Sequence, residues 1–195
     1  MTARLRKLPL ALTVLLVALA VGGCGSSHSR VSTGTYAGES GANAPYLNVG
    51  PLEYEVQLSR ELNPTDKEDA SYLQGLTPEQ RKLEAGQEWF AVFIQVYNNT
   101  SQEHLASDNL SIEDAEQNRY TPIVPEESNP FIYRAGTVQA NNQLPLPGTI
   151  ADDDPAQGLV MLFKIQIASL DNRPLELKIV NPENPAESAS AELDV

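Results

Sequence analysis

The sequence has one cysteine, Cys24, and two histidines in 195 residues. A lone cysteine excludes a disulfide within the chain and a metal centre built from several thiolates. If Cys24 is itself modified, no thiol remains to act as a nucleophile. The stability of the protein therefore has to come from the packing of its core, for which about 170 residues suffice.

Basic residues are also scarce, with 13 Lys and Arg against 26 Asp and Glu. Three of the 13, Arg4, Arg6 and Lys7, lie at the extreme N-terminus, so residues 24–195 carry ten basic against 26 acidic residues, a formal charge of −16. This charge repels nucleic acid and anionic lipid head groups, and no nucleic-acid partner is expected. It favours solubility, cationic partners or divalent ions, with a solvated exterior as the simplest interpretation.

The N-terminus is typical of an export signal. Arg4, Arg6 and Lys7 precede an apolar run over residues 8–21, which is too short for a comfortable membrane span. Gly22, Gly23 and Cys24 follow, and small residues directly before a cysteine resemble a bacterial lipobox. The resemblance implies that residues 1–23 are a signal peptide and that Cys24 receives a diacylglyceryl anchor, which binds membranes stably. The alternative is an ordinary signal peptide.

Residues 24–50 are predicted to form the lipidated cysteine and a flexible tether, since Gly, Ser, Thr, Ala and Asn dominate without periodicity. A flexible coil of this length spans about 25–30 Å. Residues 51–195 are predicted to form the folded domain.

The stretch over residues 89–98 is expected to be the central strand of that domain. Phe90, Val92, Ile94 and Val96 alternate at period two and are all aromatic or β-branched. The opposite face begins apolar and turns polar at Gln95. One face should therefore lie fully in a core, with the other half covered.

Residues 52–58 alternate in the same way, with Leu52, Tyr54, Val56 and Leu58 predicted to face inward. Residues 60–87 break this rhythm, and Thr77-Pro78-Glu79-Gln80 is typical of the start of a short helix. This insertion carries several large apolar side chains, and it is expected to cover Trp89 and Phe93. A ligand groove is the alternative.

The second half of the chain is predicted to contain further strands joined by polar turns. We expect strands at residues 110–112 and 118–123, with Asn118 taking positive φ. Six prolines make residues 122–155 irregular. Residues 158–168 are predicted to form a long strand with an apolar face ending at Ile167, and to pair with residues 175–179 as a hairpin. A last edge strand is expected at residues 191–195.

Candidate ligand-binding side chains are few. Asp152, Asp153 and Asp154 form the densest charge run and could bind calcium, but they lack the alternating spacing of a calcium-binding loop. His104 has no second ligand nearby in the sequence and is predicted to be an exposed loop residue. No metal site and no cofactor are therefore predicted.

The order of the motifs resembles a known family. The motifs are Tyr97-Asn98-Asn99, Leu110-Ser111-Ile112-Glu113-Asp114, Asn118-Arg119-Tyr120, Leu146-Pro147-Gly148, Gly158 before Val160, Leu162 and Phe163, and Leu175-Glu176-Leu177. This series resembles the DUF4352 family of secreted bacterial lipoproteins, which share an immunoglobulin-like β-sandwich with the mycobacterial antigen MPT63. The family often has glycine where this chain has Asn118, and the insertion at residues 61–87 is long for it. The resemblance covers residues 52–180 and implies no catalytic residues.

These observations predict an all-β, immunoglobulin-like antiparallel β-sandwich with a short helical insertion, anchored by lipid on the outer side of the cell membrane. The leading hypothesis is a non-catalytic binding or structural module with a protein or envelope partner. One alternative is an ion-binding or accessory subunit of an envelope transporter. Another is a hydrolase that uses Asp152 to Asp154, or Glu126 and Glu127. Two converging carboxylates of raised pKa in a cleft would favour the hydrolase.

Overall fold

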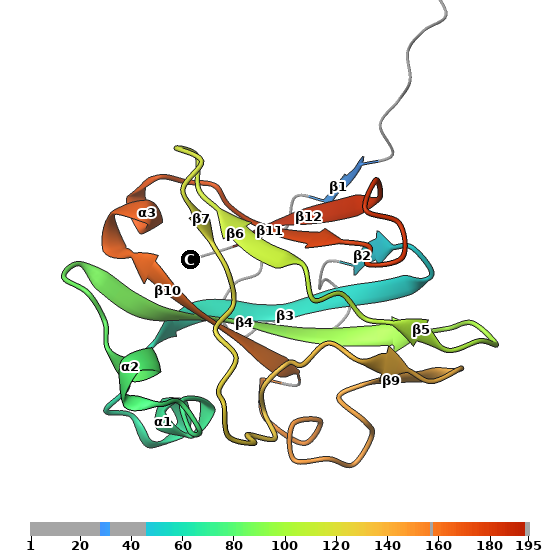
Figure 1. The fold of residues 1–195 in the computed structure, drawn as a ribbon, viewed down its shortest axis with the longest axis horizontal. Coiled ribbons are helices and arrows are strands. Elements are labelled where there is room, and N and C mark those ends of the chain that lie inside the picture. Colours follow the sequence, from blue (N-terminus) through green and yellow to red (C-terminus); the bar gives the residue numbers. More distant parts are fainter. Residues whose placement is uncertain (1–27, 32–45, 157, 194–195) are drawn as a thin grey trace, which may run out of the picture.

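The computed structural model describes residues 28–31, 46–156 and 158–193, which form two β-sheets packed face to face (Figure 1). The first sheet has the strand order β1-β12-β11-β6-β7, and the second has the order β10-β4-β3-β2, with β9 also pairing with β4. β1 and β12 are parallel, and every other pairing of named strands is antiparallel. The expected all-β sandwich with a short helical insertion is confirmed.

The elements of the described chain have the following bounds. The first sheet contains β1 (His28–Val31), β12 (Ser188–Leu193), β11 (Leu175–Val180), β6 (Leu110–Glu113) and β7 (Arg119–Tyr120). The second contains β10 (Leu159–Gln166), β4 (Gln87–Asn98), β3 (Leu52–Leu62), β2 (Tyr46–Val49) and β9 (Asn142–Leu144). A small sheet pairs β5 (His104–Leu105) with β8 (Thr137–Val138), and the helices are α1 (Lys67–Tyr72), α2 (Pro78–Arg81) and α3 (Ile167–Asp171).

β4 is the central strand that its sequence predicts. It pairs with β3 on one side and with β10 on the other, and it is buried from Trp89 to Val96. Phe90, Val92, Ile94 and Val96 lie in the core between the two sheets. Because β-branched and aromatic side chains pack well on a pleated surface, this strand holds the centre of the second sheet.

The outer face of the second sheet is covered by the insertion, as expected. Tyr72, Leu73 and Leu76 of the insertion join Trp89 and Phe93 in a second apolar cluster. α2 begins with the predicted capping box, in which the Thr77 hydroxyl accepts the N–H of Gln80 and the Gln80 side chain accepts the N–H of Thr77. α1 was not predicted: its signals are the Asp66 cap and the acidic first turn with Glu68 and Asp69, and the helix is only six residues long. Figure 1 places α1 and α2 below the second sheet.

The predicted tether extends too far along the chain. β2 pairs with β3, from Tyr46 opposite Glu55 to Val49 opposite Leu52, and β1 pairs with β12. The sandwich therefore includes residues 46–49 and 28–31, which lie before the boundary expected at residue 51. Composition alone missed β2 because four residues are too few to show a clear period.

The predicted facing of Leu58 is wrong. The register of β3 against β4 shifts between Val56 and Leu58, which is a β-bulge. The extra residue moves Leu58 to the outer face, where it packs on the second apolar cluster, and it leaves Gln57 buried. Glu55, which the same alternation places on the outer face, is buried there against Tyr97.

The predicted hairpin between the two C-terminal apolar segments is also wrong. β10 pairs with β4 in the second sheet, whereas β11 pairs with β6 and β12 in the first. α3 carries the chain between the sheets, and Ile167, expected on the apolar face of a strand, is half exposed at its start. The final strand β12 has partners on both sides, so it is not an edge strand.

Two smaller expectations also need correction. In the turn before β7 it is Gln117, with φ 69°, that takes the positive φ expected of Asn118. His104 is a strand residue of β5, only partly exposed, with Nε2 3.0 Å from the Thr100 hydroxyl and Nδ1 3.8 Å from a Glu183 oxygen.

Candidate functional site

The predicted lipidation residue, Cys24, lies outside the described residues. Within the described part of the chain, no helix has the length and apolar character needed to cross a membrane.

The acidic run at residues 152–154 does not converge on one point. Asp152 accepts the N–H of Gly148 at 2.9 Å, while Asp154 accepts the N–H of Ala156 and the hydroxyl of Tyr72, each at 3.0 Å. Asp153 is exposed. Across residues 28–31, 46–156 and 158–193, no group of three or more His, Cys, Asp or Glu side chains is arranged to hold a metal ion. The visible role of Asp152 and Asp154 is to accept hydrogen bonds that shape this loop.

Glu126 and Glu127, the other candidate carboxylates, lie exposed in the loop after β7. The Glu127 backbone contacts the insertion through its N–H, which donates to Gly75 O at 3.2 Å. Its carbonyl accepts the Arg134 guanidinium at 3.2 Å. These contacts use the backbone of Glu127 and give its carboxylate no place in a site.

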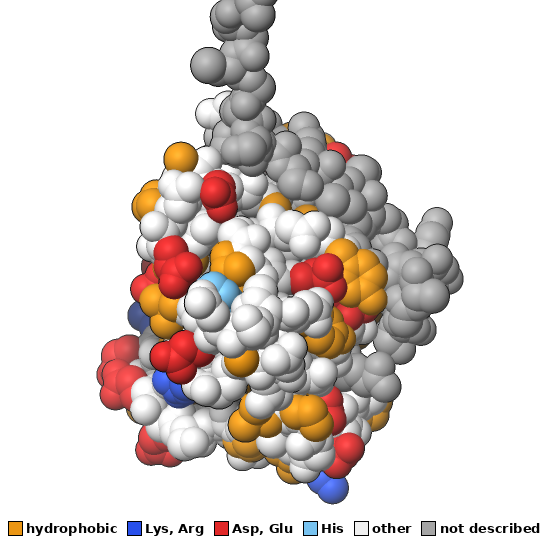
Figure 2. Space-filling model, turned by 90° about the vertical axis from the view of Figure 1, so that its right-hand side faces the viewer, with side chains coloured by type: hydrophobic (Ala, Val, Ile, Leu, Met, Phe, Trp, Pro, Cys, Tyr) orange, Lys and Arg blue, Asp and Glu red, His pale blue; other side chains and the backbone are white. Residues whose placement is uncertain are grey.

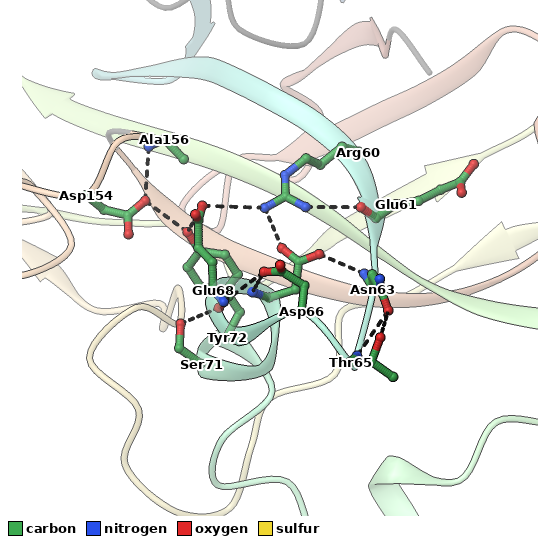
Figure 3. Close-up of polar contacts among 11 residues, drawn as sticks. Arg60, Glu61, Asn63, Thr65, Asp66, Glu68, Ser71, Tyr72, Asp154 and Ala156 are labelled. Atoms are coloured by element: carbon green, nitrogen blue, oxygen red, sulfur yellow. Dashed lines mark hydrogen bonds and ion pairs between the residues drawn. The ribbon is translucent and has the colours of Figure 1, made fainter.

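The most developed charged cluster of the described chain lies between β3, α1 and the loop before β10 (Figure 3). Arg60 of β3 places Nη2 2.6 Å from Asp69 Oδ1, and Nη1 donates to the Glu61 carbonyl at 3.2 Å. Its guanidinium also lies 5.6 Å from the ring centre of Phe93. A guanidinium that contacts both an aromatic ring and a carboxylate makes strong interactions with each. Arg60 can therefore hold α1 against β3.

Asp69 is the buried acid of this cluster. Besides Arg60, it accepts the N–H of Asn63 at 2.7 Å through Oδ2. Burial alone would raise the pKa of Asp69, but the hydrogen bonds from Arg60 and Asn63 and the charge of Arg60 together lower it below its ordinary value. Asp69 is therefore ionised at neutral pH and is unsuited to act as a general acid.

Tyr72 closes the cluster from the other side. It is fully buried, and its hydroxyl donates to Asp154 Oδ1, which lies 82 residues along the chain. Burial and the Asp154 carboxylate raise the pKa of Tyr72 far above its usual range. The ring packs edge to face on Phe93 and Phe131, with centroid distances of 5.2 and 5.3 Å. The cluster therefore holds the insertion on the sheet, because Asp69 of the insertion binds Arg60 of β3 and Tyr72 of the insertion binds Asp154.

A second buried carboxylate, Asp114, organises the turn between β6 and β7. Oδ1 accepts the N–H groups of Glu116 and Asn118, and Oδ2 accepts the Asn118 amide and the Ser169 hydroxyl, all between 2.7 and 2.9 Å. Burial would raise the pKa of Asp114, but these hydrogen bonds lower it. This acid connects the first sheet to α3, which sequence reasoning could not foresee.

The protein should lose stability in acid because of these two aspartates. Their folded pKa values lie below the ordinary 3.8, so their stabilisation is complete above that pH and is lost as the pH falls through the folded values. Asp69→Asn and Asp114→Asn should lower stability at neutral pH but make its pH dependence shallower. Urea unfolding at neutral pH and at about pH 3 measures both effects.

Glu88 should affect the pH dependence of stability in the opposite direction, so it serves as a control. Burial and the charge of Glu61 raise the pKa of Glu88, so protonation on acidification stabilises the folded state. Glu88→Gln should therefore steepen the net loss of stability in acid. An unchanged slope in all three variants would contradict the assignment.

Glu88 has a pKa raised by burial, and the neighbouring charge that contributes to the shift belongs to Glu61. The Oε1 of Glu88 is buried without a hydrogen-bond partner among the described residues. The pocket lined by Glu113 and Glu176 and the pocket lined by Asp108 and Leu110 do not include Glu61 or Glu88. These two pockets therefore do not place Glu61 and Glu88 in a cleft.

Tyr97 and Glu55 form a polar contact on the outer face near the other end of the second sheet. The Tyr97 hydroxyl donates to Glu55 Oε2 at 2.9 Å and also lies against Gln95 Oε1. Burial and the hydrogen bond to Glu55 raise the pKa of Tyr97. At this end of the domain, where β5 and β9 lie, Figure 2 shows scattered acidic and hydrophobic side chains and few Lys or Arg.

The chain is similar in structure to several solved proteins. No family model and no curated protein matches the chain. The solved structure of ycdA from Bacillus subtilis, a protein proposed to be a lipoprotein, has a TM-score of 0.46 and 10% identity, over 76% of this chain and 38% of that one.

Two further solved structures are similar over most of their own length. An uncharacterised β-sandwich protein from Clostridium difficile has a TM-score of 0.43 and 13% identity, over 86% of this chain and 95% of that one. The yjhA protein of Bacillus subtilis has a TM-score of 0.45 and 10% identity, over 77% and 96% of the two chains. These similarities assign no function and no site residue.

Proposed function

We propose that the chain is a lipoprotein held on the outer side of the cell membrane through Cys24, whose β-sandwich is a non-catalytic binding or structural module. The observation that carries the anchor is the placement of the only cysteine directly after Gly22 and Gly23, at the end of an apolar run. The formal charge of −16 from Cys24 onward suits a protein that remains soluble beside a membrane.

The non-catalytic role is supported by the way in which the acidic side chains are used. Asp69, Asp114 and Asp154 each accept at least two hydrogen bonds or ion-pair contacts from the fold itself. A carboxylate occupied in this way supports structure more readily than proton transfer. We further propose membership of the DUF4352-like immunoglobulin-like lipoproteins, on the motifs between residues 97 and 177.

Replacing Cys24 tests the anchor. Cys24→Ser removes the sulfur that would carry the diacylglyceryl group, so the protein should leave the membrane fraction or accumulate unprocessed. Fractionation, together with the mass of the N-terminal peptide, measures both outcomes.

Ser32→Ala serves as the matched control, since it changes a hydroxyl outside the lipobox and should stay in the membrane fraction. If Cys24→Ser remains in the membrane at the mature size, the lipoprotein proposal is wrong. If wild type and Cys24→Ser are both released at the mature size, the N-terminus is an ordinary signal peptide.

A further inference from the structure

The edge of the first sheet has a gap where β7 leaves β6. β11 pairs with all four residues of β6, but β7 pairs only with Ile112 and Glu113. The chain then crosses to the second sheet, where the Ile123 N–H donates to the Leu162 carbonyl of β10 at 2.7 Å. Among the described residues, no strand therefore pairs on this side with the half of β6 that contains Leu110 and Ser111.

The ladder also fixes the direction in which the Leu110 backbone points. Val180 N–H donates to the Asn109 carbonyl on the β11 side, whereas Asp114 N–H donates to the Asn118 carbonyl on the β7 side. Bonding direction alternates along a strand, so the N–H and C=O of Leu110 point toward the gap. Extension of the β7 register would place Pro122 opposite Leu110, and proline has no N–H to donate.

The gap is also a pocket. A cavity of about 220 Å³ is lined by Asp108, Asn109, Leu110, Thr121, Pro122, Val124, Tyr133 and Ala135. Leu110 and Tyr133 are almost fully buried, while Val124 is 42% exposed. The pocket therefore places an edge of β6, with which no described strand pairs at Leu110, beside an apolar recess, and proteins bind extended peptides by this combination.

The charges around this recess favour a basic occupant. The carboxylate of Asp108 lines it and lies near enough to Tyr133 to help raise the pKa of that hydroxyl. Glu126 and Glu127 follow Val124 in the chain and are exposed. The neighbouring cation, Arg134, donates to the carbonyls of Pro125 and Glu127. The acidic side chains thus outnumber the basic one here.

We propose that the edge of β6 at Leu110 binds a short extended segment of a partner protein by strand addition. The segment would place an apolar side chain between Leu110, Pro122 and Val124, and a Lys or Arg two positions away, on the same face, beside Asp108. This inference rests on the proposed binding role but not on the lipid anchor, so the Cys24→Ser result does not decide it.

Titration of the full-length chain in detergent micelles with a defined probe tests the proposal. The probe is the capped peptide Thr-Val-Thr-Lys-Thr-Val-Thr, whose Val and Lys side chains share one face when it is extended. In nitrogen-15 spectra, the amides of Leu110 and Ser111 should shift on addition of millimolar peptide. The same peptide with Glu in place of Lys, or with N-methylated backbone amides, should bind about tenfold more weakly or not at all.

Surface variants locate the site without disturbing the core. Asp108→Lys and Val124→Asp should each weaken binding of the Lys peptide about tenfold. Glu116→Lys and Ile167→Asp are the controls, because they change the charge by the same amount as Asp108→Lys and Val124→Asp at exposed positions that do not line the pocket. Both controls should bind the peptide like wild type. The proposal is overturned if Leu110 does not shift, if the N-methylated peptide binds equally, or if the pocket variants match their controls. Peptide-independent shifts that grow with protein concentration would instead identify a second copy of the chain as the occupant.

Discussion

Phe90→Ala should lower the free energy of unfolding by about 3–5 kcal/mol, a large part of a domain's typical 5–15 kcal/mol. Phe90 is fully buried in β4, opposite Phe163 of β10, and faces the core between the two sheets. Truncation removes its buried apolar surface and leaves a cavity that surrounding strands cannot easily fill. With one cysteine in the chain, no internal disulfide offsets the loss. The midpoint of urea unfolding measures it.

Leu146→Ala is the matched control, because it also truncates a large apolar side chain but at a position that is 48% exposed. It should change stability by about 0.5 kcal/mol or less. Gln95, on the opposite face of β4, is a poor control, since it is only 8% exposed and contacts Tyr97. Similar small losses in Phe90→Ala and Leu146→Ala would show that the face of β4 with Phe90 is not the core.

Arg60→Met should lower the free energy of unfolding by about 3 kcal/mol. The substitution keeps an apolar stem over Phe93 but leaves Asp69, whose side chain is 7% exposed, without its cation. Removal of one partner from a buried ion pair typically costs about 3–5 kcal/mol. The lower end applies because 26% of the Arg60 side chain is exposed and water screens part of the interaction. Denaturant unfolding of the purified variant checks the value.

The double variant Arg60→Met/Asp69→Asn should recover part of this loss, since it removes the unpaired charge and keeps a side-chain oxygen that can accept the Asn63 N–H. Arg119→Met is the control: its partner Glu113 lies 3.8 Å away, half of the Arg119 side chain is exposed, and the expected loss is below about 1 kcal/mol. If Arg60→Met costs no more than Arg119→Met, the Arg60–Asp69 pair does not fasten the insertion. Limited proteolysis within residues 63–86 should report the same weakening.

The contacts of the insertion distinguish between the two roles considered for it, a cover over Trp89 and Phe93 and a ligand groove. The apolar side chains of the insertion cover Trp89 and Phe93. Its Asp69 carboxylate binds Arg60 of β3, and the Tyr72 hydroxyl donates to Asp154 in the loop before β10. A ligand groove in this place would need at least part of that face to be open. The contacts instead describe a cover, and the pocket proposed for binding lies on the first sheet, at the end of β7.

By itself, the sequence determined the features that neighbouring residues encode. The alternation of Phe90, Val92, Ile94 and Val96 predicts a buried strand, because period two places such side chains on one face whatever lies beyond them. The same reasoning identified β6 and β11, and the capping box at Thr77 fixed the start of α2 through contacts only three residues apart. All of these are local, so no knowledge of the fold was needed.

Only the tertiary structure decided which of these elements meet. β10 and β11 each have an apolar face in the sequence, but they belong to different sheets, because an apolar face specifies burial and not a partner strand. The bulge before Leu58 moves its side chain to the other face, and the hydrogen bond from Tyr72 to Asp154 joins residues 82 positions apart. The open edge at Leu110 arises only because β7 crosses to the second sheet. Such contacts depend on the free energy with which distant segments pack together. No short stretch of the sequence determines that free energy.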